Sequence, residues 1–302
     1  MNRVGLIWNK NSHRNQSGGR GSVPDNVLEV VPEDPAELFP ALRRFAAEGV
    51  DLVVIDGGDG TVREVITRLP EAYGGPLPRL AVVPNGKTNA LAIDIGTPLG
   101  TTLEQLLGSA RVAGSTKRRH CLEIVRPGQT MPERRGFLFG LGAFVRGTEL
   151  AQKNHGLGLF DNAAIGVTMI GAAARTLLGG PADPWRRGEA MTLPFAQLEE
   201  RAWFLLLAST LKRLPLGLRP FGAPREGLKV LAIAAPPSRF ARAIPILLGG
   251  ATAPWLQAAG YHRADLLDFE VEFSGNFVLD GEVYEGGGLQ VRQGPELEFI
   301  VP

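Results

Sequence analysis

The 302-residue chain has a single cysteine, Cys121, so no disulfide can form within it and nothing in it requires an oxidising compartment. Its four histidines show no metal-ligand spacing, and we expect them to be ordinary side chains. The longest apolar stretch, Ala163–Leu178, is interrupted by Arg175 and by glycines and is too short to span a bilayer comfortably. The N-terminus lacks the apolar core of a signal peptide. We therefore expect a cytoplasmic protein that is at most peripheral to a membrane.

The chain also lacks an excess of charge of either sign. It has 32 Lys and Arg against 31 Asp and Glu, a net charge of +1. Nucleic acid is not an expected partner, because binding to a phosphate backbone needs a concentrated basic face. The length suggests two domains. The oligomeric state stays open, and a homodimer is one of the options.

Strand and helix signals alternate in the first third of the chain. Short apolar runs predict strands at Val4–Trp8, Val27–Val31, Leu52–Ile55 and Leu80–Val83. Helical patterns follow near residues 38–46, at Val62–Leu69, at Thr88–Ile93 and at Leu103–Leu107, the last opened by a Thr101-x-x-Glu104 capping box and closed by Gly108. This alternation predicts an α/β domain with a parallel sheet.

The pattern changes around Arg111–His120, a small, polar and basic segment that we interpret as a linker. Many short apolar runs follow, separated by Gly, Pro and charged residues, which favours a mostly antiparallel β domain. Within it, Asn162–Leu178 and Phe240–Leu248 look more helical. We therefore expect one domain over residues 1–115 and a second over residues 116–302.

The strongest chemical signal is Gly57-Gly58-Asp59-Gly60-Thr61, which follows a buried strand and precedes a helix. Thr61 and Glu64 have the spacing of a capping box, which would begin the helix at Thr61. Glycines let the backbone approach a phosphate, and the N–H groups of a helix N-terminus favour an anion. Asp59 lies in the turn, where its carboxylate is suited to hold Mg²⁺ on phosphates. The alternative is an ordinary Asp-Gly turn, but the combination favours a phosphate site.

A second glycine turn, Pro84-Asn85-Gly86-Lys87-Thr88-Asn89, follows the next strand. Two such loops from neighbouring parallel strands would meet at the carboxyl edge of the sheet, where open α/β folds bind ligands. Their repetition points to a nucleotide.

The third element is Asp280-Gly281-Glu282, between apolar runs near the C-terminus. A β-hairpin with an Asp-Gly turn is the default interpretation. A carboxylate at such a turn is also able to accept a proton from an attacking hydroxyl group.

These three elements, in this order, resemble the diacylglycerol kinase catalytic family, which includes bacterial lipid kinases, sphingosine kinases and ceramide kinases. The resemblance implies a nucleotide-binding α/β domain, a β-sandwich domain that takes the lipid, and an active site in the cleft between them. It further implies ATP and Mg²⁺, and transfer of the γ-phosphate to a hydroxyl of a lipid such as diacylglycerol or ceramide.

The resemblance also assigns roles to residues. Asp280 matches the family's proposed general base, while in the sphingosine kinase branch the base is the residue that matches Asp59. We prefer Asp280 as the base and Asp59 as the magnesium-linked residue. The nucleotide-binding positions implied are Asn9, Gly57, Gly58, Asp59, Gly60, Thr61, Glu64, Gly86, Lys87, Asn89 and Glu282.

Some positions depart from the family pattern. Lys87 replaces the usual threonine, Ala90 replaces an aspartate, and Lys10 replaces a proline after Asn9. Lys87 would either contact phosphate as a point charge or be solvated. Two other functions stay open: an NAD kinase-like enzyme, which carries the same Gly-Gly-Asp-Gly-Thr loop, and a catalytically silent lipid- or nucleotide-binding protein.

Two groups of apolar segments bear on the lipid. Leu141–Phe144 and Leu157–Phe160 would either line an acyl pocket or belong to the core. Trp203–Phe221 interleaves apolar residues with cations, which suits docking on an anionic bilayer, but a core strand followed by an exposed loop is the simpler interpretation.

Overall fold

The computed structural model describes residues 3–16, 22–111, 115–154, 176, 183–193 and 201–302. They form two compact units: unit 1 runs up to Cys121 and includes Pro295–Pro302, and unit 2 is Leu122–Gly294. The expected helix at Asn162–Leu178, Thr176 excepted, and the expected lining segment Leu157–Phe160 lie outside the described residues. Among the described residues, no helix is both long and apolar enough to cross a membrane.

Unit 1 is built on a parallel sheet with the strand order β2-β1-β3-β4-β15. The strands and helices are β1 (Val4–Trp8), β2 (Val27–Val30), α1 (Leu38–Ala47), β3 (Leu52–Gly57), α2 (Asp59–Tyr73), β4 (Arg79–Pro84), α3 (Ala90–Ile95), α4 (Leu103–Arg111) and the end of β15 (Leu289–Ile300). The predicted alternation of strands and helices is therefore confirmed for this unit.

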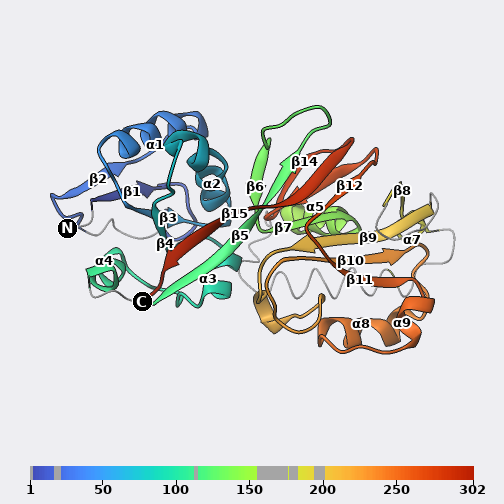
Figure 1. Cartoon of the computed structure of the whole chain (residues 1–302). Helices are drawn as coiled ribbons and strands as arrows, with labels where there is room; N and C mark the ends of the chain where they lie inside the picture. Colours follow the sequence, from blue (N-terminus) through green and yellow to red (C-terminus); the bar gives the residue numbers. More distant parts are fainter. Residues whose placement is uncertain (1–2, 17–21, 112–114, 155–175, 177–182, 194–200) are drawn as a thin grey trace. The chain divides into compact units, whose positions relative to one another are not determined.

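Helices cover both faces of this sheet (Figure 1). One face packs alternate strand residues such as Leu6 and Val54 against Leu106 and Leu107 of α4. The other face lies against α1, so closely that a Cβ on Gly5 would lie 2.5 Å from the ring of Phe45. Because both faces are covered, the strands are continuous apolar runs, and their carboxyl ends are left to carry the polar loops.

Unit 2 contains an antiparallel sheet with the order β11-β10-β9-β7-β13-β14, to which β8 adds beside β9. Its strands are β7 (Leu138–Gly142), β8 (Glu189–Met191), β9 (Arg201–Ser209), β10 (Leu228–Ala234), β11 (Tyr261–Leu266), β13 (Asn276–Leu279) and β14 (Glu282–Glu285). Outside it, β6 (Arg134–Gly136) pairs with β5 (Thr116–Val125), and β12 (Asp268–Val271) pairs with β15. Its described helices are α5 (Ala143–Asn154), α7 (Pro184–Arg187), α8 (Phe240–Leu248) and α9 (Trp255–Ala258).

The expected linker at Arg111–His120 needs correction, and the two compact units meet at Cys121–Leu122, six residues beyond the boundary that the sequence suggests. Residues 116–125 form one continuous strand, β5, and the last eight residues belong to unit 1, where Phe299 of β15 pairs with Leu80 of β4. The segment looks like a linker because Thr116–Arg118 are exposed. Arg119, by contrast, is buried and donates to Asp94 of α3 at 2.5 Å.

Both expected capping boxes also need correction. Helix α2 begins at Asp59 with the extended Gly58 as its N-cap, three residues before the predicted N-cap Thr61, because the N–H of Val62 already bonds the carbonyl oxygen of Gly58. At α4 the reciprocal bonds join Thr102 and Gln105, one residue beyond the predicted pair, and Gly108 lies inside the helix.

Candidate active site

The two predicted glycine turns of unit 1 touch through their backbones. A Cβ added to Gly86 would lie 2.3 Å from the Cα of Gly58, and one added to Gly58 would lie 2.8 Å from the Cα of Gly86. No side chain fits between them, so both positions require glycine. The N–H of Asn85 donates to the carbonyl oxygen of Gly57 at 3.1 Å and joins the loops further. The structure thus brings the Gly57–Thr61 loop and the Gly86–Asn89 loop together, as the sequence predicts.

Asp59 fastens the first loop to the start of α3. Its two carboxylate oxygens accept from the N–H groups of Ala90 at 2.9 Å and Leu91 at 3.2 Å. Burial raises the pKa of Asp59, although these N–H donors and the charge of Arg63 act in the opposite direction. The carboxylate therefore serves first as a cap for the unbonded N–H groups of the neighbouring helix.

Asn9 and Asn89 hold the loops from either side. The side-chain amide of Asn9 donates to the hydroxyl oxygen of Thr61 at 2.8 Å. Asn89 is buried and left-handed, with φ of 53°, and its amide exchanges two hydrogen bonds with the backbone of Gly86. The sequence analysis assigned both residues to nucleotide binding, and it missed that they bond the loops themselves.

A carboxylate that the sequence analysis passed over, Asp56, joins three loops. Its Oδ1 accepts from the amide of Asn15 at 2.8 Å and from that of Asn85 at 2.7 Å. Burial raises the pKa of Asp56, and the two amide hydrogen bonds act in the opposite direction. The available signal was its place directly before Gly57, where a strand that is otherwise apolar ends on a charge.

Glu64 does not reach back to the helix start. It accepts from Arg68 at 2.7 Å and from Arg63 at 3.3 Å. Burial pushes the pKa of Glu64 upward, but the hydrogen bond from Arg68 and the charges of both arginines outweigh it and lower the pKa. Its observed contacts hold side chains along α2. Lys87, in contrast, is exposed on the second loop.

The described residues of this cluster do not by themselves fit a bound magnesium ion. In the described part of the chain, no group of three or more His, Cys, Asp or Glu side chains is placed to hold a metal ion. Both oxygens of Asp59 already accept backbone hydrogen bonds. A divalent cation takes most of its ligands as free oxygen atoms, so we assign no resident metal here.

Asp280 lies in unit 2 at the tight turn between β13 and β14, as the hairpin interpretation predicts. Both turn residues are left-handed, with φ of 47° at Asp280 and 82° at Gly281. The Oδ1 of Asp280 accepts from the N–H groups of Phe137 at 3.0 Å and Leu138 at 2.9 Å, and Oδ2 lies at a longer 3.2 Å from the first of these. A Cβ on Gly136 would lie 2.5 Å from Oδ2, so a glycine makes room for the carboxylate.

The remaining predicted residues of unit 2 divide between surface and core. Glu282 is exposed on β14. Leu141 of the expected acyl lining is fully buried in the core with Phe139 and Leu206. In the expected docking stretch, Trp203, Leu211 and Phe221 are buried, and only the intervening loop is exposed, with Leu216 at 51%. The core interpretation describes these segments better.

Part of the sequence is similar to known lipid kinases. Residues 24–121 match the sequence model of the diacylglycerol kinase catalytic domain. The chain is 38% identical to the lipid kinase YegS of Escherichia coli K12 over 65 residues, which is 22% of this chain and 21% of that protein. It is 42% identical to a probable YegS-like lipid kinase of Citrobacter koseri over 50 residues, 17% of each chain. These matches span about a fifth of the relatives' length.

The fold extends further than the sequence match. A crystal structure of a diacylglycerol kinase from Bacillus anthracis superimposes with a TM-score of 0.61 at 16% identity and covers 99% of this chain and 97% of that one. The predicted fold class, an α/β domain followed by a mostly antiparallel β domain, is thereby confirmed.

Proposed function

We propose that the chain is an ATP-dependent kinase that phosphorylates a lipid hydroxyl, because its residues 24–121 match the diacylglycerol kinase catalytic domain. Diacylglycerol and ceramide are the acceptors that we favour. The observation that carries the proposal is the contact between the two glycine loops, where Gly58 and Gly86 leave the backbone bare at the carboxyl edge of a parallel sheet.

The loop cluster is suited to the phosphates of ATP. Gly57, Gly58 and Gly60 present backbone without side chains at the start of α2, whose N–H groups and dipole favour an anion. Asn9, Thr61 and Asn89 fix the loops through the hydrogen bonds described above, so little order has to be gained on binding. The exposed Lys87 would add a point charge.

Three further assignments follow from this arrangement. We propose that Asp59 acts as a positioning residue through α3, and that any Mg²⁺ enters with the ATP phosphates. Glu64 would act indirectly, by holding Arg63 and Arg68. We also propose that Glu282 contacts the nucleotide; its side chain is exposed on β14.

Asp280 is the proposed general base. Its Oδ1 takes the two short backbone bonds, and Oδ2, which lies 3.2 Å from the N–H of Phe137, is the carboxylate oxygen that we propose as the proton acceptor. The acceptor hydroxyl would give its proton to this oxygen while its own oxygen forms a bond to the γ-phosphorus, and the bond to the bridging oxygen breaks to release ADP. The backbone N–H donors to Oδ1 hold the carboxylate in place for this step.

The test is transfer of labelled γ-phosphate from ATP, with Mg²⁺ present, to a panel of diacylglycerol, ceramide, sphingosine and NAD. We expect label in one lipid and its loss in Asp280→Asn. Label in NAD alone would replace the proposal with the NAD kinase-like alternative. No label in any acceptor, together with nucleotide binding measured by calorimetry, would favour a silent binding protein.

A further inference from the structure

Helix α8 has an outer face that is unusual for a helix on a protein surface. Its inner residues Phe240, Ala243 and Leu247 pack into the core of unit 2. The outer face of such a helix is ordinarily polar, but here Ala241 and Pro245 are exposed and carry no charge. Three more apolar residues of α8 are half-buried, namely Ile244, Ile246 and Leu248.

The charges around α8 have one sign. The segment 227–264, which contains α8 and α9, has four Lys and Arg residues and no Asp or Glu, whereas the whole chain has a net charge of only +1. Two of the four point inward: Lys229 donates to the carbonyl oxygen of Gly227, and Arg263 to that of Pro220. The other two, Arg239 and Arg242, are exposed.

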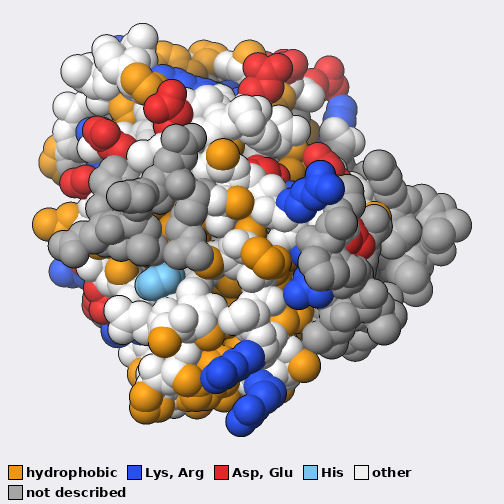
Figure 2. Space-filling view, turned by 90° about the vertical axis from the view of Figure 1, so that its right-hand side faces the viewer, with side chains coloured by type: hydrophobic (Ala, Val, Ile, Leu, Met, Phe, Trp, Pro, Cys, Tyr) orange, Lys and Arg blue, Asp and Glu red, His pale blue; other side chains and the backbone are white. Residues whose placement is uncertain are grey.

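These two arginines gather around one aromatic ring. The guanidinium carbon of Arg239 lies 5.8 Å from the ring centroid of Trp255 on α9, and that of Arg242 lies 5.9 Å from it. Figure 2 shows basic side chains beside hydrophobic ones at the lower edge of this face, with no acidic side chain drawn between them. Arginine and tryptophan next to exposed apolar residues form the combination that favours the headgroup region of a bilayer.

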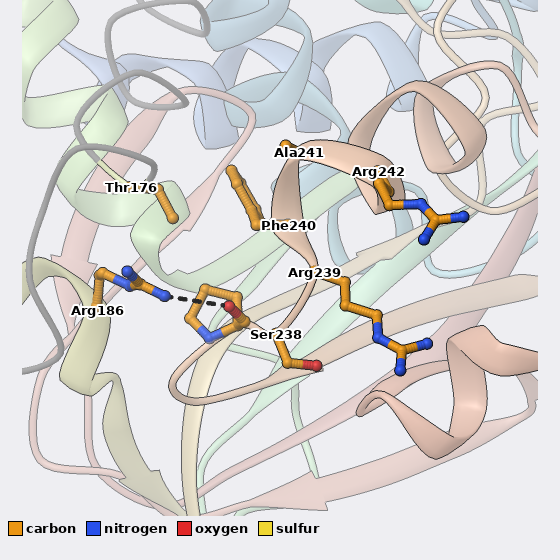
Figure 3. Close-up of a pocket in the computed structure, with 8 residues that line it drawn as sticks. Thr176, Arg186, Ser238, Arg239, Phe240, Ala241 and Arg242 are labelled. Carbon is orange, nitrogen blue, oxygen red and sulfur yellow. Dashed lines mark hydrogen bonds between the residues drawn. The ribbon is translucent and has the colours of Figure 1, made fainter.

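A cavity opens at the same place. It has a volume of about 380 Å³ and is lined by Thr176, Arg186, Ser238, Arg239, Phe240 and Arg242. Arg239 and Arg242 extend side by side from the start of α8, while Arg186 lies on the other side of the loop and donates to the carbonyl oxygen of Pro237 at 3.4 Å (Figure 3). The cavity has room for a lipid headgroup and is bordered by cations.

From these observations we propose that the α8–α9 surface, defined by Arg239, Ala241, Arg242, Pro245 and Trp255, docks on an anionic phospholipid bilayer. This inference rests on the proposed function: docking would bring a lipid kinase to the bilayer that contains its acceptor. It places the docking site on the helices that follow β10, and not on the stretch Trp203–Phe221, for which the core interpretation holds. The charge complementarity is direct: a basic, acid-free apolar surface meets an anionic one.

The experiment is co-sedimentation of the full chain, without ATP, with vesicles of phosphatidylcholine alone or mixed with phosphatidylglycerol. We expect binding to the mixed vesicles and a loss of about 30-fold in Arg239→Gln/Arg242→Gln, since removing one cation near an anionic surface lowers the affinity roughly fivefold and the two factors multiply. The matched control is Arg43→Gln/Arg111→Gln, which removes the same charge from exposed positions of α1 and α4 and should bind as the parent does.

A second pair of measurements keeps the result independent of folding and of catalysis. Arg239→Lys/Arg242→Lys keeps the charge and should retain binding, and raised salt should release the unaltered chain. Equal binding by the glutamine variant, equal loss in the control, or no binding of the parent to the mixed vesicles would overturn the proposal. Because no phosphate is transferred in this assay, a failed kinase assay beside successful vesicle binding would count against the proposed function alone.

Discussion

The two motif aspartates, Asp59 in unit 1 and Asp280 in unit 2, look alike in sequence and are used differently by the fold. Each stands next to a glycine in a turn, and each accepts hydrogen bonds from two backbone N–H groups of another segment. Asp59 divides them between its two oxygens, whereas Asp280 takes both short bonds on Oδ1. An Asp-to-Asn replacement therefore has to break one of these backbone bonds at Asp59, whereas at Asp280 it can spare both short ones.

This difference makes the same replacement, Asp to Asn, informative at both positions. At Asp280 the amide oxygen can take over the two short bonds of Oδ1, and the 3.2 Å contact of Oδ2 with the N–H of Phe137 is lost. We expect kcat to fall by about 10²- to 10⁴-fold because the base is gone. The free energy of unfolding should change by no more than about 0.5 kcal/mol.

The control for that prediction is Asp280→Ala, which removes the hydrogen bonds as well. It should lose the same activity and, in addition, about 1–3 kcal/mol of unfolding free energy in urea titrations. If Asp280→Asn keeps its activity, Asp280 is not the base, and both aspartates have a structural role.

At Asp59 the same replacement should act first on stability. The amide nitrogen would face either the N–H of Ala90 or that of Leu91, since each oxygen now serves one of them. We expect Asp59→Asn to lower the free energy of unfolding by about 1–3 kcal/mol. It should also raise the KM for ATP, because α3 and the second glycine loop would no longer be held.

The outcome that would reverse this interpretation is full stability with abolished transfer. Asp59 would then act on the reacting groups themselves, and the assignment of the base to Asp280 would be open again.

The contact between Gly58 and Gly86, beside Asp59, predicts a loss of stability similar to that of Asp59→Asn or smaller. Gly86→Ala places a Cβ 2.3 Å from the Cα of Gly58, and backbone has to move to admit it. We expect a loss of about 1–3 kcal/mol in the free energy of unfolding and a higher KM for ATP. Gly108→Ala is the matched control: it lies inside α4 with nothing within 4 Å of the new Cβ, and should stabilise by about 0.5–1 kcal/mol. Equal effects of the two replacements would contradict the loop contact.

The sequence predicted the elements that depend on local pattern. Buried runs identified β1, β3 and β4, and the Asp280-Gly281 pair identified the hairpin turn, because apolar runs and turn residues act over short distances. The glycine loops were found for the same reason. What it missed depends on contacts between distant residues: Asn9 with Thr61, 52 positions apart, and Asp280 with Phe137, 143 positions apart. The exposed half of β5 was mistaken for a linker because no local feature shows that a polar strand has a partner.

The smallest expected effect concerns Asp56. Like Asp280, and unlike Asp59, it accepts two hydrogen bonds on a single oxygen, Oδ1. Its Oδ1 accepts both amides, from Asn15 and Asn85, so Asp56→Asn can keep both bonds and removes only a half-buried charge. Burial raises the pKa of Asp56 above its ordinary value of 3.8. The folded chain then holds this proton more tightly than the unfolded chain does. The stability that Asp56 contributes is thus fully present below pH 3.8 and is lost as the pH rises through the raised pKa.

We therefore expect the free energy of unfolding of the parent, minus that of Asp56→Asn, to decrease as the pH rises through this window. Urea titrations at a series of acidic to neutral pH values measure it, and Asp25→Asn, at an exposed position before β2, controls for removing one negative charge. The raised pKa of Asp59 is common to the parent and to Asp56→Asn, so it cancels in the difference. A difference that stays flat or increases with pH would contradict the prediction, because it would mean that the two amides stabilise the charge of Asp56 at least as much as burial penalises it.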